Sequence, residues 1–156
     1  MKESLKFDRV EDSLGFKIAV THLGMKQLLS NKLKENGLDF ITPEQMAILL
    51  KLYEIDGLYQ KELADNLTKH KPNITRMVDI LEEKKLIIRQ ADGSDRRKYR
   101  LHITNKGIKA VEDIRPLLFN LLSKVFYNFD DQEIEKFKTY LDRLFNNLGE
   151  IENKQE

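Results

Sequence analysis

Apolar residues recur every three or four positions through much of the chain, and this spacing predicts helices with one buried face. The first helix is predicted over residues 8–36, where Asn36-Gly37 supplies a stop. A second helix is predicted to begin at Thr42-Pro43, because threonine can cap a helix and proline needs no N–H partner in the first turn. That helix is expected to end at Asp56-Gly57.

Two short helices are predicted next, in close succession. The first covers residues 60–67, and the second opens at Pro72. The second helix carries apolar residues at positions i, i+3, i+4 and i+7, namely Ile74, Met77, Val78 and Leu81. Two helices joined by so short a turn, the second of them basic, have the layout of a helix-turn-helix.

The hydrophobic period then changes from 3.6 to 2, which predicts a hairpin. Residues 86–89 form the first short strand, Asp92-Gly93-Ser94 has turn chemistry, and residues 98–103 form the second strand. Alternation in the second strand predicts an apolar underside of Tyr99, Leu101 and Ile103 and a basic outer face of Lys98, Arg100 and His102.

The chain is predicted to be helical again from Thr104 onward, with a kink near residues 112–115 caused by Pro116. A last helix is expected to begin after Asp130, with Glu133 reaching back to complete a capping box. Apolar residues of these helices exceed what a monomer can cover, so a two-fold dimer is expected.

Composition narrows the class of protein. A chain of 156 residues with 40% hydrophobic residues predicts one domain over residues 1–156. No apolar run approaches the roughly 18 residues of a membrane span, and no secretory signal is present, so a cytoplasmic protein without membrane contact is expected. The absence of cysteine excludes disulfides, thiol chemistry and cysteine-based zinc sites.

An enzyme is not expected. Three separated histidines and seven scattered glycines offer no nucleophile–base pair, metal cluster or phosphate-binding loop, so neither a metal nor a cofactor is predicted. The distribution of charge along the chain is uneven. Residues 60–110 hold 13 Lys/Arg and 7 Asp/Glu, a net charge of +6, whereas residues 111–156 hold 6 Lys/Arg and 10 Asp/Glu, a net charge of −4. A basic middle segment suggests a module that faces a polyanion, although a charge run is more often a solvated face.

A family resemblance rests on an ordered set of motifs. The set comprises residues 63–67 (LADNL), 74–84 (ITRMVDILEEK), 86–87 (LI), 92–97 (DGSDRR) and 101–107 (LHITNKG). In this order and spacing, the chain resembles the MarR family of bacterial regulators. The resemblance implies a mainly α fold with a small β wing, in which a winged helix-turn-helix lobe over about residues 38–110 is flanked by dimerisation helices over about 8–36 and 104–150.

The function implied by the resemblance is that of a homodimeric, sequence-specific DNA-binding transcriptional regulator. Such a protein commonly represses its own or neighbouring genes by binding a pseudo-palindromic operator in double-stranded DNA, and a small-molecule effector releases it. The serious alternative is a winged-helix module that binds a protein partner and no specific DNA. The net charge of residues 60–110 and the arginines of the hairpin favour the DNA-binding interpretation.

The second helix of the pair would enter the major groove. Its N-terminal part offers arginine for guanine or phosphate and asparagine for adenine. The candidate DNA-binding residues there are Lys69, His70, Lys71, Pro72, Asn73, Thr75 and Arg76. The alternative for Arg76 is a surface ion pair with Asp79 or Glu83.

The hairpin would be the wing that reaches the adjacent minor groove, because a slender ribbon tip carrying arginine suits a narrow, strongly negative groove. Its candidate DNA-binding residues are Ser94, Asp95, Arg96, Arg97 and Lys98. The resemblance implies that one arginine inserts while Asp95 orients a neighbouring arginine. The sequence does not distinguish the arginine that inserts from the one that Asp95 orients. The alternative to a DNA-binding wing is a solvated loop without a DNA contact.

The chain departs from the family pattern at several positions. Thr68 and Lys69 replace a glycine and an apolar residue in the turn, and His70 replaces a serine or threonine. Lys85 occupies a position where glycine is common, and Tyr59 replaces a small hydroxyl residue.

The resemblance also implies an effector site between the dimerisation helices and the DNA-binding lobe. The candidate ligand-binding residues are Phe16, His22, Met46, Leu50 and Tyr53, although residues of these types are more often plain core or surface than ligand contacts.

Overall fold

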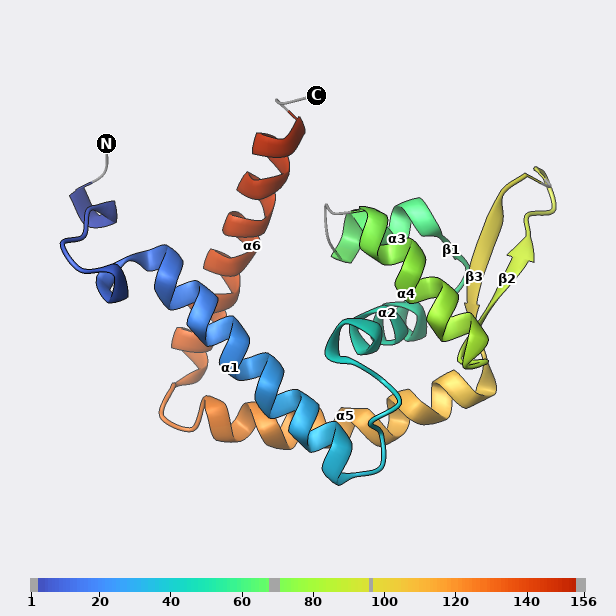
Figure 1. Cartoon of the computed structure of the whole chain (residues 1–156), viewed down its shortest axis with the longest axis horizontal. Helices are drawn as coiled ribbons and strands as arrows, with labels where there is room; N and C mark the ends of the chain where they lie inside the picture. Colours follow the sequence, from blue (N-terminus) through green and yellow to red (C-terminus); the bar gives the residue numbers. More distant parts are fainter. Residues whose placement is uncertain (1–2, 68–70, 96, 154–156) are drawn as a thin grey trace. The chain divides into compact units, whose positions relative to one another are not determined.

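The computed structural model describes residues 3–67, 71–95 and 97–153. It divides into two compact units, Met1–Pro43 and Glu44–Glu156, each of which is described by itself. Across the described residues the chain is mainly helical and carries one three-stranded antiparallel sheet (Figure 1).

The first unit is built around helix α1, Leu14–Glu35. It starts later than the predicted residue 8, because Ser13 has an extended backbone and its hydroxyl accepts a hydrogen bond from the Phe16 N–H at 3.1 Å. Two short 3-10 turns, Glu3–Leu5 and Val10–Asp12, precede the helix instead. The predicted stop is confirmed, since Gly37 has a φ of +71°.

The second unit begins with α2, Pro43–Glu54, which buries Met46, Ile48, Leu49 and Leu52. The two short helices follow as α3, Gln60–Leu67, and α4, Lys71–Glu83. Leu63 of α3 and Ile74, Val78 and Leu81 of α4 are fully or almost fully buried. The predicted helix-turn-helix pair is therefore confirmed, with its apolar stripes in the core.

The sheet has the strand order β1-β3-β2. Strands β2, Ile87–Ala91, and β3, Tyr99–Ile103, form the predicted hairpin with Arg89 opposite Leu101. Strand β1, Leu58–Tyr59, was not predicted because two residues are too few to show a period. It pairs with the other edge of β3, where Tyr59 lies opposite Arg100.

Two long helices complete the second unit: α5, Asn105–Val125, and α6, Asp131–Asn153. Thr104 caps α5 by accepting a hydrogen bond from the Gly107 N–H at 3.1 Å, and α5 continues through Pro116. The predicted capping box of α6 is present, because the Asp130 carboxylate accepts from the Glu133 N–H at 2.8 Å and Glu133 accepts from the Asp130 N–H at 3.0 Å.

Two backbone positions fix the connections on either side of the hairpin. After α4, Lys85 adopts a φ of +60°, and the Leu86 N–H donates to the Leu81 carbonyl at 2.9 Å, the pattern that ends many helices. This is the position where the family resemblance implies glycine. At the start of α5, Gly107 lies so close to the residue before β2 that a Cβ there would be 2.2 Å from the Leu86 carbonyl oxygen.

We expect Gly107→Ala to lower the free energy of unfolding by about 1–3 kcal/mol, because the added methyl group must displace backbone. The same methyl group would also lie 2.7 Å from the Ile103 side chain. Urea denaturation checks this prediction. Gly93→Ala is the matched control, since a Cβ there meets nothing within 4 Å, and equal stabilities for the two variants would contradict the close contact.

Candidate nucleic-acid interface

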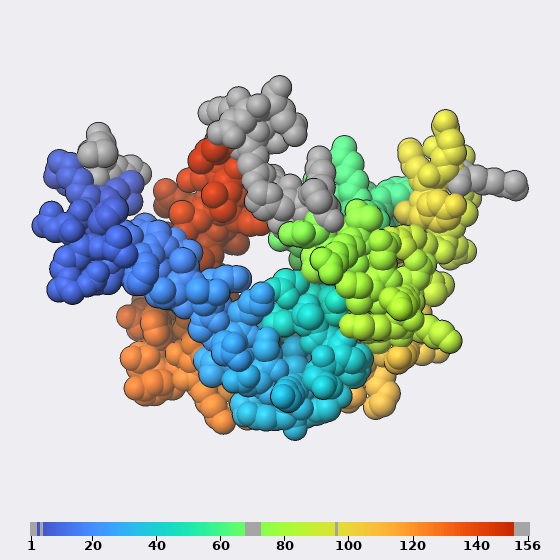
Figure 2. All heavy atoms as spheres, in the orientation of Figure 1, coloured from blue at the N-terminus to red at the C-terminus, as the bar shows by residue number. Residues whose placement is uncertain are grey.

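The exposed side of α4 is defined by what the helix buries. Ile74, Val78 and Leu81 lie in the core, so the intervening residues Asn73, Thr75 and Arg76 are exposed. In the space-filling view, residues of α4 lie at the surface of the second unit (Figure 2). Of the other candidates on this helix, Lys69 and His70 lie outside the described residues, as do the side chains of Lys71 and Pro72.

Arg76 is unpaired among the residues that the structure describes. The expected alternative, an ion pair with Asp79 or Glu83, does not form there. Asp79 instead binds Arg89 of β2 at 2.5 Å, and Arg89 also pairs with Glu82. The backbone N–H of Arg89 also donates a hydrogen bond to the Glu82 carboxylate at 3.0 Å. The second half of α4 is thereby fixed to the hairpin, while the Arg76 guanidinium is left for another anion.

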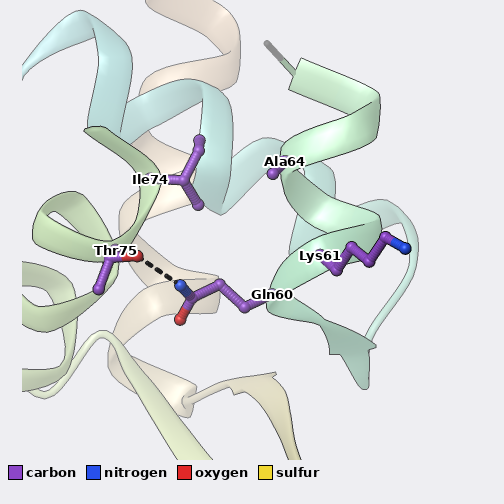
Figure 3. A pocket seen from close by; sticks show the side chains of 5 residues that line it. All are labelled: Gln60, Lys61, Ala64, Ile74 and Thr75. Atoms are coloured by element: carbon purple, nitrogen blue, oxygen red, sulfur yellow. Dashed lines mark hydrogen bonds between the residues drawn. The ribbon is translucent and has the colours of Figure 1, made fainter. Parts of the chain in front are cut away.

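Thr75 has a partner that sequence reasoning missed. The Gln60 side-chain amide of α3 donates to the Thr75 hydroxyl oxygen at 2.7 Å (Figure 3). The two residues border a pocket of about 230 Å³ between α3 and α4, lined also by Lys61, Ala64 and Ile74. The only signal in the sequence is that Gln60 is the first residue of its helix, which does not predict a contact fifteen residues away.

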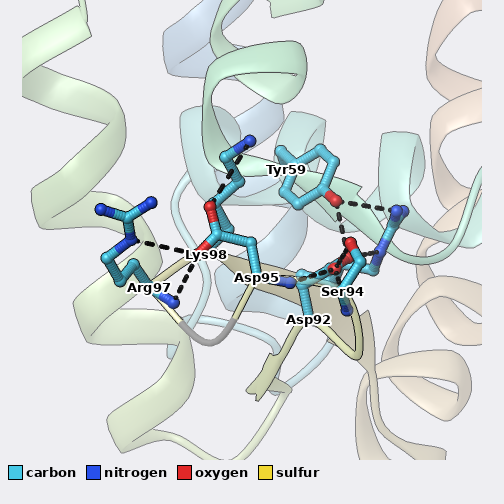
Figure 4. A network of polar contacts seen from close by, with 7 residues as sticks. Tyr59, Asp92, Ser94, Asp95, Arg97 and Lys98 are labelled. Atoms are coloured by element: carbon cyan, nitrogen blue, oxygen red, sulfur yellow. Dashed lines mark hydrogen bonds and ion pairs between the residues drawn. The ribbon is translucent and has the colours of Figure 1, made fainter.

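The turn of the hairpin is organised by the carboxylate of Asp92, which is buried. One oxygen accepts hydrogen bonds from the Ser94 N–H at 2.8 Å, the Asp95 N–H at 3.2 Å and the Ser94 hydroxyl. Figure 4 shows these bonds converging on the carboxylate. Ser94, predicted as a DNA contact, therefore also shapes the turn.

Asp95 orients Arg97. Its carboxylate accepts from the Arg97 N–H at 3.1 Å and from Arg97 Nε at 3.2 Å, and it lies 3.8 Å from the Lys98 ammonium. The Arg97 side chain is nevertheless 92% exposed, so its remaining N–H groups face outward. The resemblance left open which arginine Asp95 holds, and the described partner is Arg97. Arg96 lies outside the described residues.

Two of the three residues predicted for the basic outer face of β3 are paired with carboxylates. Arg100 donates to the second Asp92 oxygen at 2.7 Å, to the Gly57 carbonyl at 3.0 Å and to the Tyr59 hydroxyl at 2.9 Å. His102 lies 2.8 Å from the Asp56 carboxylate. Alternation gave the correct period, but it could not show that residues of β1, of the turn before it and of the hairpin turn would contact these side chains. The expected apolar underside also holds only in part, since Tyr99 is exposed.

Tyr59 completes this polar network. Its hydroxyl donates to Asp92 at 2.6 Å, and the Arg100 guanidinium carbon lies 4.3 Å from the centre of its ring. Hydrogen bonds from Ser94, Tyr59 and Arg100 hold the pKa of Asp92 well below its usual range. The bond to Asp92 raises the pKa of Tyr59, so the phenol remains a donor.

The candidate ligand-binding residues are divided between the two units. Phe16 and His22 are exposed residues of α1 in the first unit. In the second unit, Met46 belongs to the core of α2, Leu50 is half-buried, and the Tyr53 ring lies 5.8 Å from the Arg115 guanidinium. No described helix is long and apolar enough to cross a membrane, and the described residues contain no group of three or more potential metal ligands.

Comparison with known proteins identifies the family. The model of the MarR family matches residues 41–99. HTH-type transcriptional regulator MhqR of Bacillus subtilis is 31% identical over 114 residues, which are 73% of this chain and 79% of MhqR. The chain belongs to the MarR family. Its members are DNA-binding transcriptional regulators rather than enzymes, and this chain is such a regulator.

Solved structures of MarR proteins share the fold. The Staphylococcus aureus MepR–DNA complex aligns with a TM-score of 0.76 at 28% identity over 90% of this chain and 99% of MepR. A MarR transcriptional regulator from Methanosarcina mazei aligns with a TM-score of 0.73 at 28% identity over 88% of this chain and 97% of that one. The winged helix-turn-helix expected from the motifs is thus confirmed.

We expect Asp92→Asn to reduce the pH dependence of stability in acid. The wild-type carboxylate stays ionised in the folded state, whereas it takes up a proton near the ordinary value of 3.8 when unfolded. Its contribution is therefore fully present above that value and is lost as the pH falls through the lower folded-state pKa. The stability difference between wild type and D92N should shrink between about pH 5 and pH 3.

Urea denaturation at a series of pH values measures this difference. Asp65→Asn, which removes the charge of an exposed aspartate of α3, is the matched control variant. If the curves for D92N and the wild type ran parallel through the acid range, Asp92 would not hold its charge in the folded protein.

Proposed function

We propose that this MarR protein is a homodimeric repressor that binds a pseudo-palindromic operator upstream of its own or neighbouring genes. The observation that carries the proposal is that helix α4 and the tip of the hairpin each expose an arginine side chain. Arg76 on α4 has no described partner, and Arg97 at the hairpin tip is held outward by Asp95. A major-groove helix beside a minor-groove wing requires cations at these two places.

Within this proposal, α4 reads base edges through Asn73, Thr75 and Arg76. The other proposed contacts are Lys71 and Pro72 in its first turn and, before them in the sequence, Lys69 and His70. Arginine pairs well with guanine and asparagine with adenine. The wing contributes Ser94, Asp95, Arg96, Arg97 and Lys98. The net charge of +6 over residues 60–110 supplies the sequence-independent attraction to phosphate.

The dimer is supported by an apolar stripe along α6. Phe137, Leu141, Leu144, Phe145 and Leu148 follow one face of the helix and are all exposed in the single chain. Helix α1, in the other unit, also exposes apolar residues, among them Leu14, Ile18 and Leu28. A second copy of the chain would remove these surfaces from water, and two-fold symmetry would place two α4 helices on successive turns of DNA.

Release by a small-molecule effector is part of the same proposal. MepR, to which this chain is similar, is described as a transcription regulator of a multidrug efflux pump. The residues proposed to contact an effector are Phe16, His22, Met46, Leu50 and Tyr53.

Repression is tested with a reporter gene. Expression of a reporter from the gene's own promoter should rise when the protein is deleted, and should fall instead if the protein activates transcription.

We expect Arg76→Ala to weaken operator binding by about 1–3 kcal/mol per half-site, because a base or phosphate loses its cation. Fluorescence anisotropy with the duplex upstream of the protein's own gene measures this, at several salt concentrations and against a scrambled duplex. Lys136→Ala removes one exposed charge from α6 and should leave binding unchanged. Equal affinities of wild type and R76A, with a protein partner lost instead, would favour the protein-interaction module.

We expect Leu141→Glu to convert the dimer to monomers, since it places a charge in the apolar stripe of α6. Sedimentation velocity distinguishes the two masses. Lys136→Glu introduces the same side chain elsewhere on the helix and should leave a dimer. A dimeric L141E protein would mean that α6 does not form the interface.

A further inference from the structure

Two consecutive residues at the junction of β1 and α3 contact the two proposed DNA-binding elements separately. Tyr59, the last residue of β1, donates its hydroxyl to Asp92 in the hairpin at 2.6 Å. Gln60, the first residue of α3, donates its amide to Thr75 of α4 at 2.7 Å. One peptide unit therefore joins the hairpin to the exposed face of α4.

On the hairpin side, the contact reaches the tip. The Asp92 carboxylate that binds Tyr59 also accepts from the backbone N–H groups of Ser94 and Asp95. Asp95 in turn holds Arg97. A shift of the Tyr59 hydroxyl would therefore disturb the Asp92 hydrogen bonds that hold the turn, and with them the orientation of Arg97.

On the α4 side, the contact is a direct hydrogen bond between two helices, beside a pocket. Gln60 and Thr75 border the pocket of about 230 Å³ between α3 and α4 (Figure 3). Ala64 and Ile74, which also line the pocket, are buried, so the hydrogen bond joins the two helices at the edge of their apolar contact. Thr75 directly precedes Arg76, so its position affects the residue proposed to enter the groove.

We propose that Tyr59-Gln60 is a positioning dipeptide that sets the placement of the hairpin and of α4 relative to each other, and thereby the operator specificity. This inference rests on the proposed function, since it assumes that both elements contact DNA. Neither Tyr59 nor Gln60 needs to touch DNA. The proposed consequence is reciprocal: loss of the Tyr59 hydroxyl loosens α4, and loss of the Gln60 amide loosens the hairpin.

The first test needs no DNA. Hydrogen exchange, followed by mass spectrometry, is measured for the wild type, Tyr59→Phe and Gln60→Ala. We expect Y59F to speed exchange in the first turns of α4, and Q60A to speed exchange in residues 92–98. Tyr127→Phe is the matched control, because it removes a hydroxyl from a tyrosine that is 82% exposed. Changes confined to each variant's own hydrogen-bond partner would overturn the proposal.

The second test measures coupling on DNA. Affinity for the duplex upstream of the protein's own gene is determined for Y59F, Q60A, Arg97→Ala and their double mutants. We expect Y59F and Q60A each to weaken binding by about three- to tenfold, the size expected for one lost hydrogen bond. The R97A loss should be smaller in the Y59F background, because Arg97 is already poorly aimed.

Two readouts separate positioning from other roles. The salt dependence of binding should be the same for Y59F and wild type, since no phosphate contact is lost. Fully additive losses of binding free energy in Y59F, Q60A and R97A, or a changed salt dependence for Q60A, would overturn the proposal in favour of independent or direct contacts.

The Arg76 variant separates failure of this inference from failure of the proposed function. If R76A weakens binding while Y59F does not, the inference fails and the proposed function stands. If R76A has no effect, the proposed function fails, and hydrogen exchange alone decides the coupling.

Discussion

The arrangement of the hairpin depends on one buried carboxylate, that of Asp92. A buried charge is tolerated only when its oxygens are hydrogen-bonded and its charge is compensated. Here, Arg100 supplies the charge and Tyr59 a hydroxyl, while backbone N–H groups of the turn satisfy the other oxygen. Because every one of these donors must reach the same atoms, β1, β3 and the turn are held in one geometry.

The local elements could be predicted from the sequence, because their signals lie within a few residues. The capping box of Asp130 and Glu133 spans one helical turn and is found as predicted. The stripe of Ile74, Val78 and Leu81 needs only the helical period to be recognised as a core face. The motifs likewise predicted the family and the winged helix-turn-helix.

The network around Asp92 could not be predicted, since its members are far apart in the sequence. Tyr59 is 33 positions from Asp92 and 41 from Arg100, and neither separation leaves a periodic trace. The two-residue strand β1, which brings Tyr59 to Arg100, is too short to be detected. The partners of Arg100 and His102 on β3 were missed for the same reason: alternation along a strand shows the direction of a side chain but not its partner.

The departures from the family pattern acquire physical meaning in the structure. Tyr59 is long enough to bring its hydroxyl to the Asp92 carboxylate and broad enough to lie against the Arg100 guanidinium. Lys85 keeps the left-handed turn at the end of α4 without glycine, at a conformational cost of about 1–2 kcal/mol for a residue with a Cβ. The helix-ending hydrogen bond to Leu81 and the buried Leu86 beside it help to compensate this cost.

Competition for one carboxylate explains why Arg76 does not pair with Asp79. On an isolated helix, Arg76 and Asp79 are three residues apart and would pair favourably. Arg89 removes that option, because it comes from a strand fixed by the sheet and binds Asp79 and Glu82 together. Two carboxylates around one partly buried guanidinium satisfy it better than a single exposed pair would, since exposed pairs contribute little. The strand thus engages Asp79 and Glu82, two of the three acidic residues of α4, and Arg76 has no described carboxylate partner.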